Sequence, residues 1–340
     1  MIKVAILGAS GYTGLELIRL VSSHPQMELC GITSRTHAGK ALSEVFPRFR
    51  GTRFSDVCFV MPSEVVGLGV EAAFLALPHG KAAPYAKELL QAGVRVFDLS
   101  ADFRLNKLAV YEEFYGEHPA PELLESAVYG MPELYEEQIK GATLVASPGC
   151  YPTSIILPLV PLLKAGLVDP TSIQAFSMSG ATGAGRKESI PLLFCEVNES
   201  VRSYGLPKHR HLSEMEQELG LAAGQDVTMT FIPHLVPTHS GIASSITVSL
   251  VGDFAEIAKV YEEAYGEAPF VRLLGAGVTA DTKNVTRTNF LDIGWHFDDR
   301  TGRLILTSAE DNIVKGASGQ AIHSFNIAFG LAPITGLTVL

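Results

Sequence analysis

The N-terminal part of the chain alternates between short apolar runs and polar turns. Ile2 to Leu7 is an apolar, β-branched run that is typical of a buried strand. Apolar residues at helical spacing follow from Leu15 to Val21, and His24-Pro25 ends that helix. Met27 to Ile32 is apolar again and predicts a second strand. This order of strand, turn, helix and strand predicts the opening unit of a doubly wound parallel sheet.

The same alternation continues as far as about residue 150. Ala72 to Leu77, Val94 to Leu99 and Thr143 to Ala146 predict further strands, and Ala82 to Ala92 predicts a helix between the first two. In open α/β sheets, ligands bind beyond the carboxyl ends of the strands. These strands end in polar or glycine-rich sequence, namely Pro78-His79-Gly80, Ser100-Ala101-Asp102 and Ser147-Pro148-Gly149-Cys150. We therefore expect these segments to line one edge of the sheet.

The pattern changes in the second half of the chain. Ile155 to Leu167 predicts a helix, and alternating strands then dominate, most clearly at Val227 to Ile232, Ile242 to Val251 and Arg303 to Thr307. Such alternation predicts a mostly antiparallel sheet with one exposed or interface face. Gly316 to Phe329 predicts a final helix. The fold class is therefore α/β, a Rossmann-type doubly wound parallel sheet plus an α+β part with a mostly antiparallel sheet.

Composition narrows the function classes. The 340 residues suit about two domains, and the formal net charge of −10 argues against broad binding to nucleic acid or anionic membranes. No apolar run approaches the roughly 18 residues of a membrane span, and no signal peptide is recognisable, so we expect a cytoplasmic protein. The four cysteines are too scattered for a disulfide scaffold or a Cys-x-x-Cys metal site, and no metal is predicted.

A glycine-rich loop lies between the first predicted strand and helix. Residues Gly8 to Gly14 match the pattern G-x-x-G-x-x-G. Glycines at these positions permit a tight turn and let backbone amides at a helix N-terminus approach a pyrophosphate. The predicted dinucleotide contacts in this loop are Gly8, Ser10, Gly11, Tyr12, Thr13 and Gly14.

The end of the second predicted strand indicates which dinucleotide binds. NAD-specific sites place Asp or Glu there to bind the ribose hydroxyls, whereas this chain has Thr33-Ser34-Arg35, with Lys40 nearby. A hydroxyl and a guanidinium suit a 2′-phosphate. Ser34 and Arg35 therefore predict NADP(H) as the cofactor.

Cys150 is the candidate nucleophile. It directly precedes an apolar helix that is predicted to begin near Ser154. A thiol at a helix N-terminus is biased toward the thiolate, which suits attack on an activated acyl group. Backbone amides from Gly149 to Tyr151 would stabilise the developing oxyanion. The other cysteines are Cys195, a weaker rival, and Cys30 and Cys58, which lie in apolar stretches typical of a core.

A cysteine nucleophile needs a proton-transfer partner, and histidine is the side chain that titrates near neutral pH. His209-Arg210-His211 is the densest basic cluster in this acidic chain and would supply both a base and an anion-binding guanidinium. No acidic residue or cysteine at suitable spacing supports a metal site there. The pattern leaves open whether His209 or His211 transfers the proton.

Two more glycine-rich loops follow. The amides of Ser179 to Lys187 and the two cations that end this loop suit a phosphate or a carboxylate. Asp311 to Gln320 leads into the last predicted helix, whose N-terminus is predicted to return to the cofactor. The remaining predicted cofactor contacts are Leu77, Pro78, Ser100, Ser179, Gly180, Asn312 and Gly316. The predicted substrate contacts are Arg104, Ser147, Arg186, Lys187 and Arg210.

Together these motifs resemble one family of enzymes. They run, from residue 8 to residue 320, in the order G-A-S-G-Y-T-G, L-P-H-G, D-L-S-A-D-F-R, S-P-G-C-Y-P-T, S-G-A-T-G-A-G-R, H-R-H and D-N-I-V-K-G-A-S-G-Q. In this order and content the chain resembles the N-acetyl-γ-glutamyl-phosphate reductases of arginine biosynthesis. S-P-G-C-Y-P-T is the most diagnostic motif. The related aspartate-semialdehyde dehydrogenases share the layout, but their cysteine has a different local sequence.

The resemblance implies a fold, a reaction and an assembly. It implies an NADP-binding Rossmann domain of residues 1–148 and 315–340, and a catalytic and oligomerisation domain of residues 149–314 in a homodimer or homotetramer. The implied reaction is NADPH-dependent reduction of N-acetyl-γ-glutamyl phosphate to the semialdehyde, with release of phosphate, through a thioester on Cys150. His211 matches the family's acid/base, and His209 is the less favoured neighbour.

One departure from the family and three alternative functions remain open. The family usually has arginine where this chain has Ser240, within Thr238-His239-Ser240-Gly241, so a cationic substrate contact is either missing or supplied by His239. The first alternative is the acetylaminoadipyl phosphate reductase of lysine biosynthesis, because one methylene is worth only about 1–3 kcal/mol in discrimination. The others are a non-catalytic NADP-binding regulator and a reductase that forms no covalent intermediate.

Overall fold

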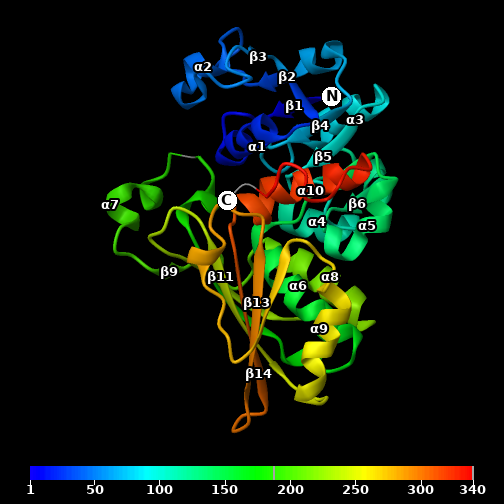
Figure 1. The fold of residues 1–340 in the computed structure, drawn as a ribbon, viewed down its shortest axis with the longest axis vertical. Helices are drawn as coiled ribbons and strands as arrows, with labels where there is room; N and C mark the ends of the chain where they lie inside the picture. The colour runs from blue at the N-terminus through cyan, green and yellow to red at the C-terminus, as the bar shows by residue number, and fades with distance from the viewer. Residues whose placement is uncertain (187, 339–340) are drawn as a thin grey trace. The chain divides into compact units, whose positions relative to one another are not determined.

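The chain forms two units, each built on one seven-stranded sheet (Figure 1). The computed structural model describes residues 1–186 and 188–338. Among the described residues, the first unit contains Met1–Pro148 together with residues 317–338, and the second contains Gly149–Gly316. Within the described residues, none of the helices has both the length and the apolar character needed to cross a bilayer.

The first unit is a parallel sheet, as the apolar runs predicted. Its strands are β1 (Ile2–Leu7), β2 (Met27–Thr33), β3 (Phe59–Val60), β4 (Ala72–Leu75), β5 (Arg95–Asp98), β6 (Ala127–Tyr129) and β7 (Leu144–Ala146), in the spatial order β3-β2-β1-β4-β5-β7-β6. Every pairing in this sheet is parallel. Its helices are α1 (Tyr12–Ser23), α2 (Leu42–Val45), α3 (Ala83–Gln91), α4 (Leu108–Tyr115), α5 (Pro132–Lys140) and α10 (Gly319–Ala328).

Helices cover both faces of this sheet. Ala83 and Leu89 of α3 belong to the apolar core on one face. On the other face, Phe325 of α10 lies 5.7 Å from Phe74 of β4 and 5.6 Å from Phe97 of β5, measured between ring centroids. The strands are therefore buried on both faces, which explains their nearly continuous apolar sequence.

The second unit is a mixed sheet. Its strands are β8 (Gln174–Ser179), β9 (Arg202–Ser203), β10 (Thr230–Leu235), β11 (Ile242–Ser249), β12 (Val271–Ala276), β13 (Leu291–Asp298) and β14 (Arg303–Glu310), in the order β12-β13-β14-β11-β8-β10-β9. The pairs β8/β10 and β12/β13 are parallel, and the other neighbours are antiparallel, as predicted for most of this sheet. Its helices are α6 (Cys150–Lys164), α7 (Phe194–Val197), α8 (His211–Ala223) and α9 (Ile257–Tyr265).

Short helical turns connect these elements. A π-helical turn at Val314–Ser318 precedes α10, so the last helix begins at Gly319 rather than at the predicted Gly316. The 3-10 helices are Pro47–Phe49, Pro62–Leu68, Pro121–Ser126, Pro170–Ser172, Ala181–Ala184, Ile190–Leu192, Phe254–Glu256 and Thr282–Asn284.

Helix α6 is the buried centre of the second unit. Apart from its two ends, all its residues are buried, although it contains Pro158 and Pro161. Each proline lacks an N–H and leaves the carbonyl four residues earlier without its helical partner. Side chains of β14 and α9 replace the missing donors: Ser308 Oγ donates to the Ser154 carbonyl, and the Tyr265 hydroxyl donates to the Leu157 carbonyl.

The mixed sheet gathers distant loops at one end. Its register pairs Ser179 with both Leu235 and Ile242, and pairs Ile242 and Leu291 with Glu310. Segments 180–186, 236–241, 281–290 and 311–316 therefore extend from the same end of the sheet. Three of the glycine-rich or histidine-containing sequences recognised above meet there.

Candidate active site

Cys150 is the first residue of α6. Gly149 precedes it as the N-cap, with an extended backbone of φ −69° and ψ 157°. The helix therefore begins earlier than the predicted Ser154, because Pro152 fits a first turn whose amides have no partner within the helix. Cys150 is partly exposed, and the N-terminus of a 15-residue helix favours its thiolate form.

The imidazole of His211 lies directly against the start of α6. A Cβ atom built on Gly149 would be 2.5 Å from His211 Nε2, closer than a real contact permits. His211 is the first residue of α8, and Glu214 in the same turn accepts a hydrogen bond from the Gly149 amide at 2.8 Å. The first turns of α6 and α8 therefore hold the thiol and the imidazole in one site.

Gly149→Ala should reduce turnover about ten- to hundredfold, because its methyl group would displace the imidazole, and misplacement by about 1 Å can cost that much. Steady-state kinetics would measure the loss. Gly141→Ala is the matched control, since nothing lies within 4 Å of its added Cβ and its φ is −98°. Equal activity in the two variants would contradict the proposed role of the contact between Gly149 and His211.

His209 supports His211 from within an aromatic cluster. Its Nδ1 accepts a hydrogen bond from the backbone amide of His211 at 3.1 Å, and their ring centroids are 5.0 Å apart. Burial, with a smaller contribution from the charge of Arg210, lowers the pKa of His209 to about 4. Tyr151 and Tyr204 complete the cluster with a 2.8 Å hydrogen bond between their hydroxyls. Burial raises the pKa of both tyrosines, that of Tyr204 to about 12.

The lowered pKa of His209 predicts a loss of stability in acid. In the unfolded chain this histidine has a pKa near 6.5, so between pH of about 6.5 and about 4 the unfolded state binds a proton that the folded state excludes. We expect the free energy of unfolding to fall by up to roughly 3 kcal/mol across that range. Urea titrations should show a shallower fall for His209→Gln. The exposed His239→Gln is the control, and identical pH slopes in the wild type and His209→Gln would contradict the prediction.

A third segment closes on Cys150. A Cβ on Gly316 would lie 2.8 Å from both Cys150 Cβ and Glu310 Oε1, so a glycine is required there, and both Cys150 and the Glu310 carboxylate lie against it. The sequence analysis missed Glu310 and Glu214, both of which are buried. The available signals were an acidic residue ending an apolar strand and an acidic residue in the first turn of a helix.

The second glycine-rich loop is bound to the third. Asn312 Oδ1 accepts from the Gly241 amide at 2.7 Å, and Asn312 Nδ2 donates to Thr182 Oγ1 at 3.0 Å. Ser179 is buried, and Gly180 packs so closely on the backbone of residues 239–240 that a side chain would not fit. The predicted anion contacts Arg186 and Arg210 are both exposed, whereas Lys187 lies outside the described residues.

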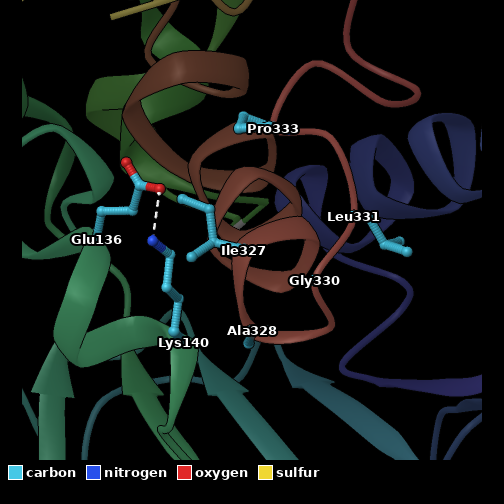
Figure 2. A pocket seen from close by; sticks show the side chains of 7 residues that line it. All are labelled: Glu136, Lys140, Ile327, Ala328, Gly330, Leu331 and Pro333. Atoms are coloured by element: carbon cyan, nitrogen blue, oxygen red, sulfur yellow. Dashed lines mark ion pairs between the residues drawn. The ribbon is translucent and has the colours of Figure 1, made fainter.

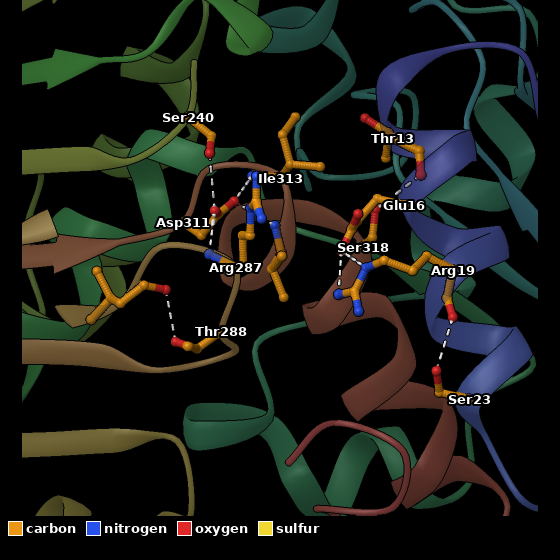
Figure 3. Close-up of polar contacts among 12 residues, drawn as sticks. Thr13, Glu16, Arg19, Ser23, Ser240, Arg287, Thr288, Asp311, Ile313 and Ser318 are labelled. Atoms are coloured by element: carbon orange, nitrogen blue, oxygen red, sulfur yellow. Dashed lines mark hydrogen bonds and ion pairs between the residues drawn. The ribbon is translucent and has the colours of Figure 1, made fainter. Parts of the chain in front are cut away.

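The first glycine-rich loop fits a dinucleotide. Gly8 has φ +85°, and a Cβ there would lie 2.2 Å from the Ala76 carbonyl oxygen. A Cβ on Gly14 would lie 2.4 Å from the Gly8 carbonyl oxygen, whereas a Cβ on Gly11, the N-cap of α1, would make only an ordinary 3.7 Å contact with that oxygen. Among the described residues no side chain caps α1, so its first amides are available to a phosphate. The Ser318 hydroxyl supports this turn by donating to the Thr13 carbonyl at 3.0 Å (Figure 3).

The end of β2 presents the residues expected beside a 2′-phosphate. Thr33 Oγ1 accepts from the Gly8 amide at 3.2 Å and so joins β2 to the glycine loop. Ser34 follows, with its hydroxyl 3.1 Å from that of Thr36. Arg35 is exposed and makes no hydrogen bond or ion pair with any described residue. No carboxylate follows the strand at Ser34 or Arg35.

Two further predicted residues have structural contacts within the first unit. The buried Ser100 hydroxyl donates to Asp98 Oδ2 at 2.7 Å, and burial together with the neighbouring Asp102 raises the pKa of Asp98. Arg104 is buried and donates to the carbonyls of Ser147 and Leu99 at 2.7 and 2.8 Å, which joins the ends of β5 and β7. The predicted cofactor contacts Leu77 and Pro78 lie in the turn after β4, which ends at Leu75; Leu77 is partly buried and Pro78 is exposed.

Comparison with known proteins identifies the family. A model described as semialdehyde dehydrogenase, NAD binding domain, matches residues 3–142, and one described as semialdehyde dehydrogenase, dimerisation domain, matches residues 150–312. Relatives named N-acetyl-gamma-glutamyl-phosphate reductase are 57% identical in Akkermansia muciniphila and 52% identical in Desulfotalea psychrophila. Each match covers 100% of this chain and 99% of the relative. The chain belongs to the N-acetyl-γ-glutamyl-phosphate reductase family.

Membership of the N-acetyl-γ-glutamyl-phosphate reductase family confirms the resemblance drawn from the motifs. The chain is an oxidoreductase, and the comparisons favour neither the lysine-pathway reductase nor a non-catalytic regulator. The fold also resembles aspartate semialdehyde dehydrogenase II of Vibrio cholerae, with a TM-score of 0.74 and 15% identity over 97% of this chain and 98% of that one. The enzyme of Candida albicans, solved with NADP, gives a TM-score of 0.72 and 15% identity over 96% and 98%.

Two cavities in the first unit are lined by residues other than the predicted site residues. One of about 310 Å³ lies between α5 and the end of α10, beside the 3.2 Å ion pair of Glu136 and Lys140 (Figure 2). A second of about 430 Å³ is lined by residues from Asn106 to Ala127. Neither contains a predicted site residue. Across residues 1–186 and 188–338, no group of three or more His, Cys, Asp and Glu side chains is arranged to hold a metal ion.

Proposed function

We propose that this chain catalyses the NADPH-dependent reduction of N-acetyl-γ-glutamyl phosphate to N-acetylglutamate 5-semialdehyde, with release of phosphate. The observation that carries the proposal is the junction of α6 and α8, where Cys150 begins one helix and His211 Nε2 lies against the preceding Gly149. A thiol at a helix N-terminus beside an imidazole is suited to acyl transfer. The family name of the relatives supports the choice of substrate.

Cys150 is the proposed nucleophile. Its thiolate attacks the acyl carbon of the substrate, so that a carbon–sulfur bond forms, the carbon–oxygen bond to the phosphoryl group breaks, and inorganic phosphate leaves. The amide of Gly149 already donates to Glu214, and Pro152 has no N–H, so the oxyanion donors are reduced to the amides of Cys150 and Tyr151. Each such donor contributes about 3 kcal/mol in comparable sites. Arg186 and Arg210 would receive the departing phosphate.

His211 is the proposed acid/base. It accepts the thiol proton before attack and returns it when the carbon–sulfur bond of the hemithioacetal breaks. His209 is less suited to this step, because its lowered pKa makes it a weak acceptor of the thiol proton near neutral pH. Its hydrogen bond to the His211 backbone supports a positioning role instead.

NADP(H) is the proposed cofactor, and it supplies the hydride that reduces the thioester. The turn from Gly8 to Gly14 would hold its pyrophosphate, since the close contacts of Gly8 and Gly14 keep the backbone near the free amides of α1. Ser34 and Arg35 would hold the 2′-phosphate. The other predicted cofactor contacts, including Ser179, Gly180, Asn312 and Gly316, remain predictions.

The assembly and location are also proposals. A homo-oligomer is supported by the matched dimerisation domain and by an apolar sheet face, where Phe176 and Met178 of β8 are 37% and 50% exposed. A dimer or a tetramer would satisfy both observations. A cytoplasmic location is supported by the four free cysteines.

The reverse reaction tests the proposed function. Purified protein is mixed with NADP, N-acetylglutamate semialdehyde and inorganic phosphate, and NADPH formation is followed by its absorbance. We expect NADPH to form only when phosphate is present. Formation that is independent of phosphate would contradict the acyl-phosphate chemistry, and a well-folded, NADP-binding protein that reacts only with the semialdehyde one methylene longer would reassign the substrate.

A further inference from the structure

Arg287 has a strained backbone next to the candidate active site. Among the described residues only Glu199 and Arg287 have positive φ without being glycine, and for Arg287 φ is 67°. Side chains are rarely accommodated in this conformation, and such strain concentrates at functional sites. The residue lies in the loop between β12 and β13, where the Arg287 amide donates to Asp311 Oδ2 at 2.7 Å (Figure 3).

Asp311 joins this loop to the turn that meets Cys150. Its Oδ2 also accepts from the Ser240 hydroxyl at 3.2 Å, so Ser240 and Arg287 are bound to the same carboxylate oxygen. Its other oxygen accepts from the Val314 amide at 3.1 Å, and its carbonyl accepts from the Gly316 amide at 2.9 Å. Arg287 is therefore two hydrogen bonds away from Gly316, which packs against Cys150.

The loop of Arg287 also packs directly on the segment that contains Ser240. A Cβ on Gly241 would lie 3.3 Å from Thr282 Cβ and 3.7 Å from Thr286 Oγ1. The resemblance noted in the sequence analysis implies an arginine at the position of Ser240. Arg287 is an arginine in the loop that packs on this segment.

The charge of Arg287 is uncompensated within the described residues. Two other cations of residues 271–290 are paired, since Lys283 pairs with Asp281 at 2.8 Å and Arg272 pairs with Asp292 at 2.6 Å. Arg287 is exposed and its guanidinium makes no hydrogen bond or ion pair with any residue that the structure describes. An exposed arginine on a fixed backbone is suited to bind an oxyanion through two parallel hydrogen bonds.

We propose that Arg287 binds an oxyanion of the substrate and supplies the cationic contact that Ser240 does not. This inference rests on the proposed function, whose substrate carries both a carboxylate and a phosphoryl group. In the reverse reaction the two anions belong to separate molecules, the semialdehyde and inorganic phosphate. The KM values of the reverse reaction therefore distinguish which anion Arg287 binds.

The test is Arg287→Gln, assayed in the reverse reaction. We expect the KM for either phosphate or the semialdehyde to rise roughly ten- to hundredfold, the effect of losing a charge-assisted hydrogen bond, while the KM for NADP stays unchanged. Lys283→Gln is the matched control, because it removes a cation of the same loop that is already paired. Unchanged KM values in Arg287→Gln would overturn the inference, as would the same rise in His239→Gln without one in Arg287→Gln.

Two glycine variants separate binding from a structural role. Arg287→Gly relieves the positive φ, so we expect the higher KM without a lower Tm, and Ser240→Arg combined with Arg287→Gly should return the KM to within about threefold of the wild type. A lower Tm with an unchanged KM would overturn the inference. If the wild type itself forms no NADPH in a phosphate-dependent way, the proposed function fails, whereas an active wild type with an unaffected Arg287→Gln removes this inference alone.

Discussion

Cys150→Ser should fold normally and lose turnover by about a thousandfold or more. The hydroxyl of serine is far less acidic than a thiol, so neither the helix N-terminus nor His211 can generate enough nucleophile at neutral pH. Without the nucleophile, the proton acceptor and the oxyanion donors no longer accelerate the reaction, so the loss of turnover is large. Phosphate-dependent NADPH formation in the reverse reaction measures it directly.

Cys195→Ser is the control for this prediction. Cys195 lies on the exposed helix α7 and was the rival nucleophile in the sequence analysis. We expect this variant to retain full activity. More than about a tenth of wild-type activity in Cys150→Ser would remove the covalent step from the mechanism, and loss of activity in Cys195→Ser alone would transfer the nucleophile to α7.

Much of the parallel sheet could be predicted because its strands carry unambiguous local signals. Predicted and observed limits agree at β1 (Ile2–Leu7), whose last four residues are apolar and buried on both faces and which Gly8 ends. Strand β13 was missed, although its residues Leu291–Asp298 form one of the longest strands. Its first five residues are buried without alternation, so the period that identifies a half-buried strand is absent. No local sequence pattern predicts the parallel pairs of the mixed sheet, because each pair joins strands that are separated in the sequence.

Some features of the candidate site could likewise be predicted from neighbouring residues, whereas others depend on residues far away in the sequence. The position of Cys150 near a helix N-terminus could be predicted from its neighbours, but the exact start of α6 could not, since Tyr-Pro-Thr has poor intrinsic helix propensity and only the first-turn position makes it compatible. Glu214 binds the Gly149 amide from 65 residues away in the sequence. Glu310 lies against Gly316, the residue that also contacts Cys150, at the end of β14, which is paired with β11 in the mixed sheet. Such contacts require the folded register, which no local pattern contains.

His211→Asn should reduce kcat about a hundred- to ten-thousandfold, the usual contribution of a positioned proton-transfer group. Asparagine fills similar space against Gly149 but does not titrate, so the limb of the pH–rate profile that belongs to the histidine should disappear as well. Alkylation of Cys150 by iodoacetamide should slow near neutral pH, because the base that accepts the thiol proton is gone. His296→Asn, on β13 with its ring nitrogen 3.2 Å from the Thr279 hydroxyl, should leave all three measurements unchanged. A pH–rate profile of unchanged shape in His211→Asn would assign the proton transfer to another group, with His209 the first to test.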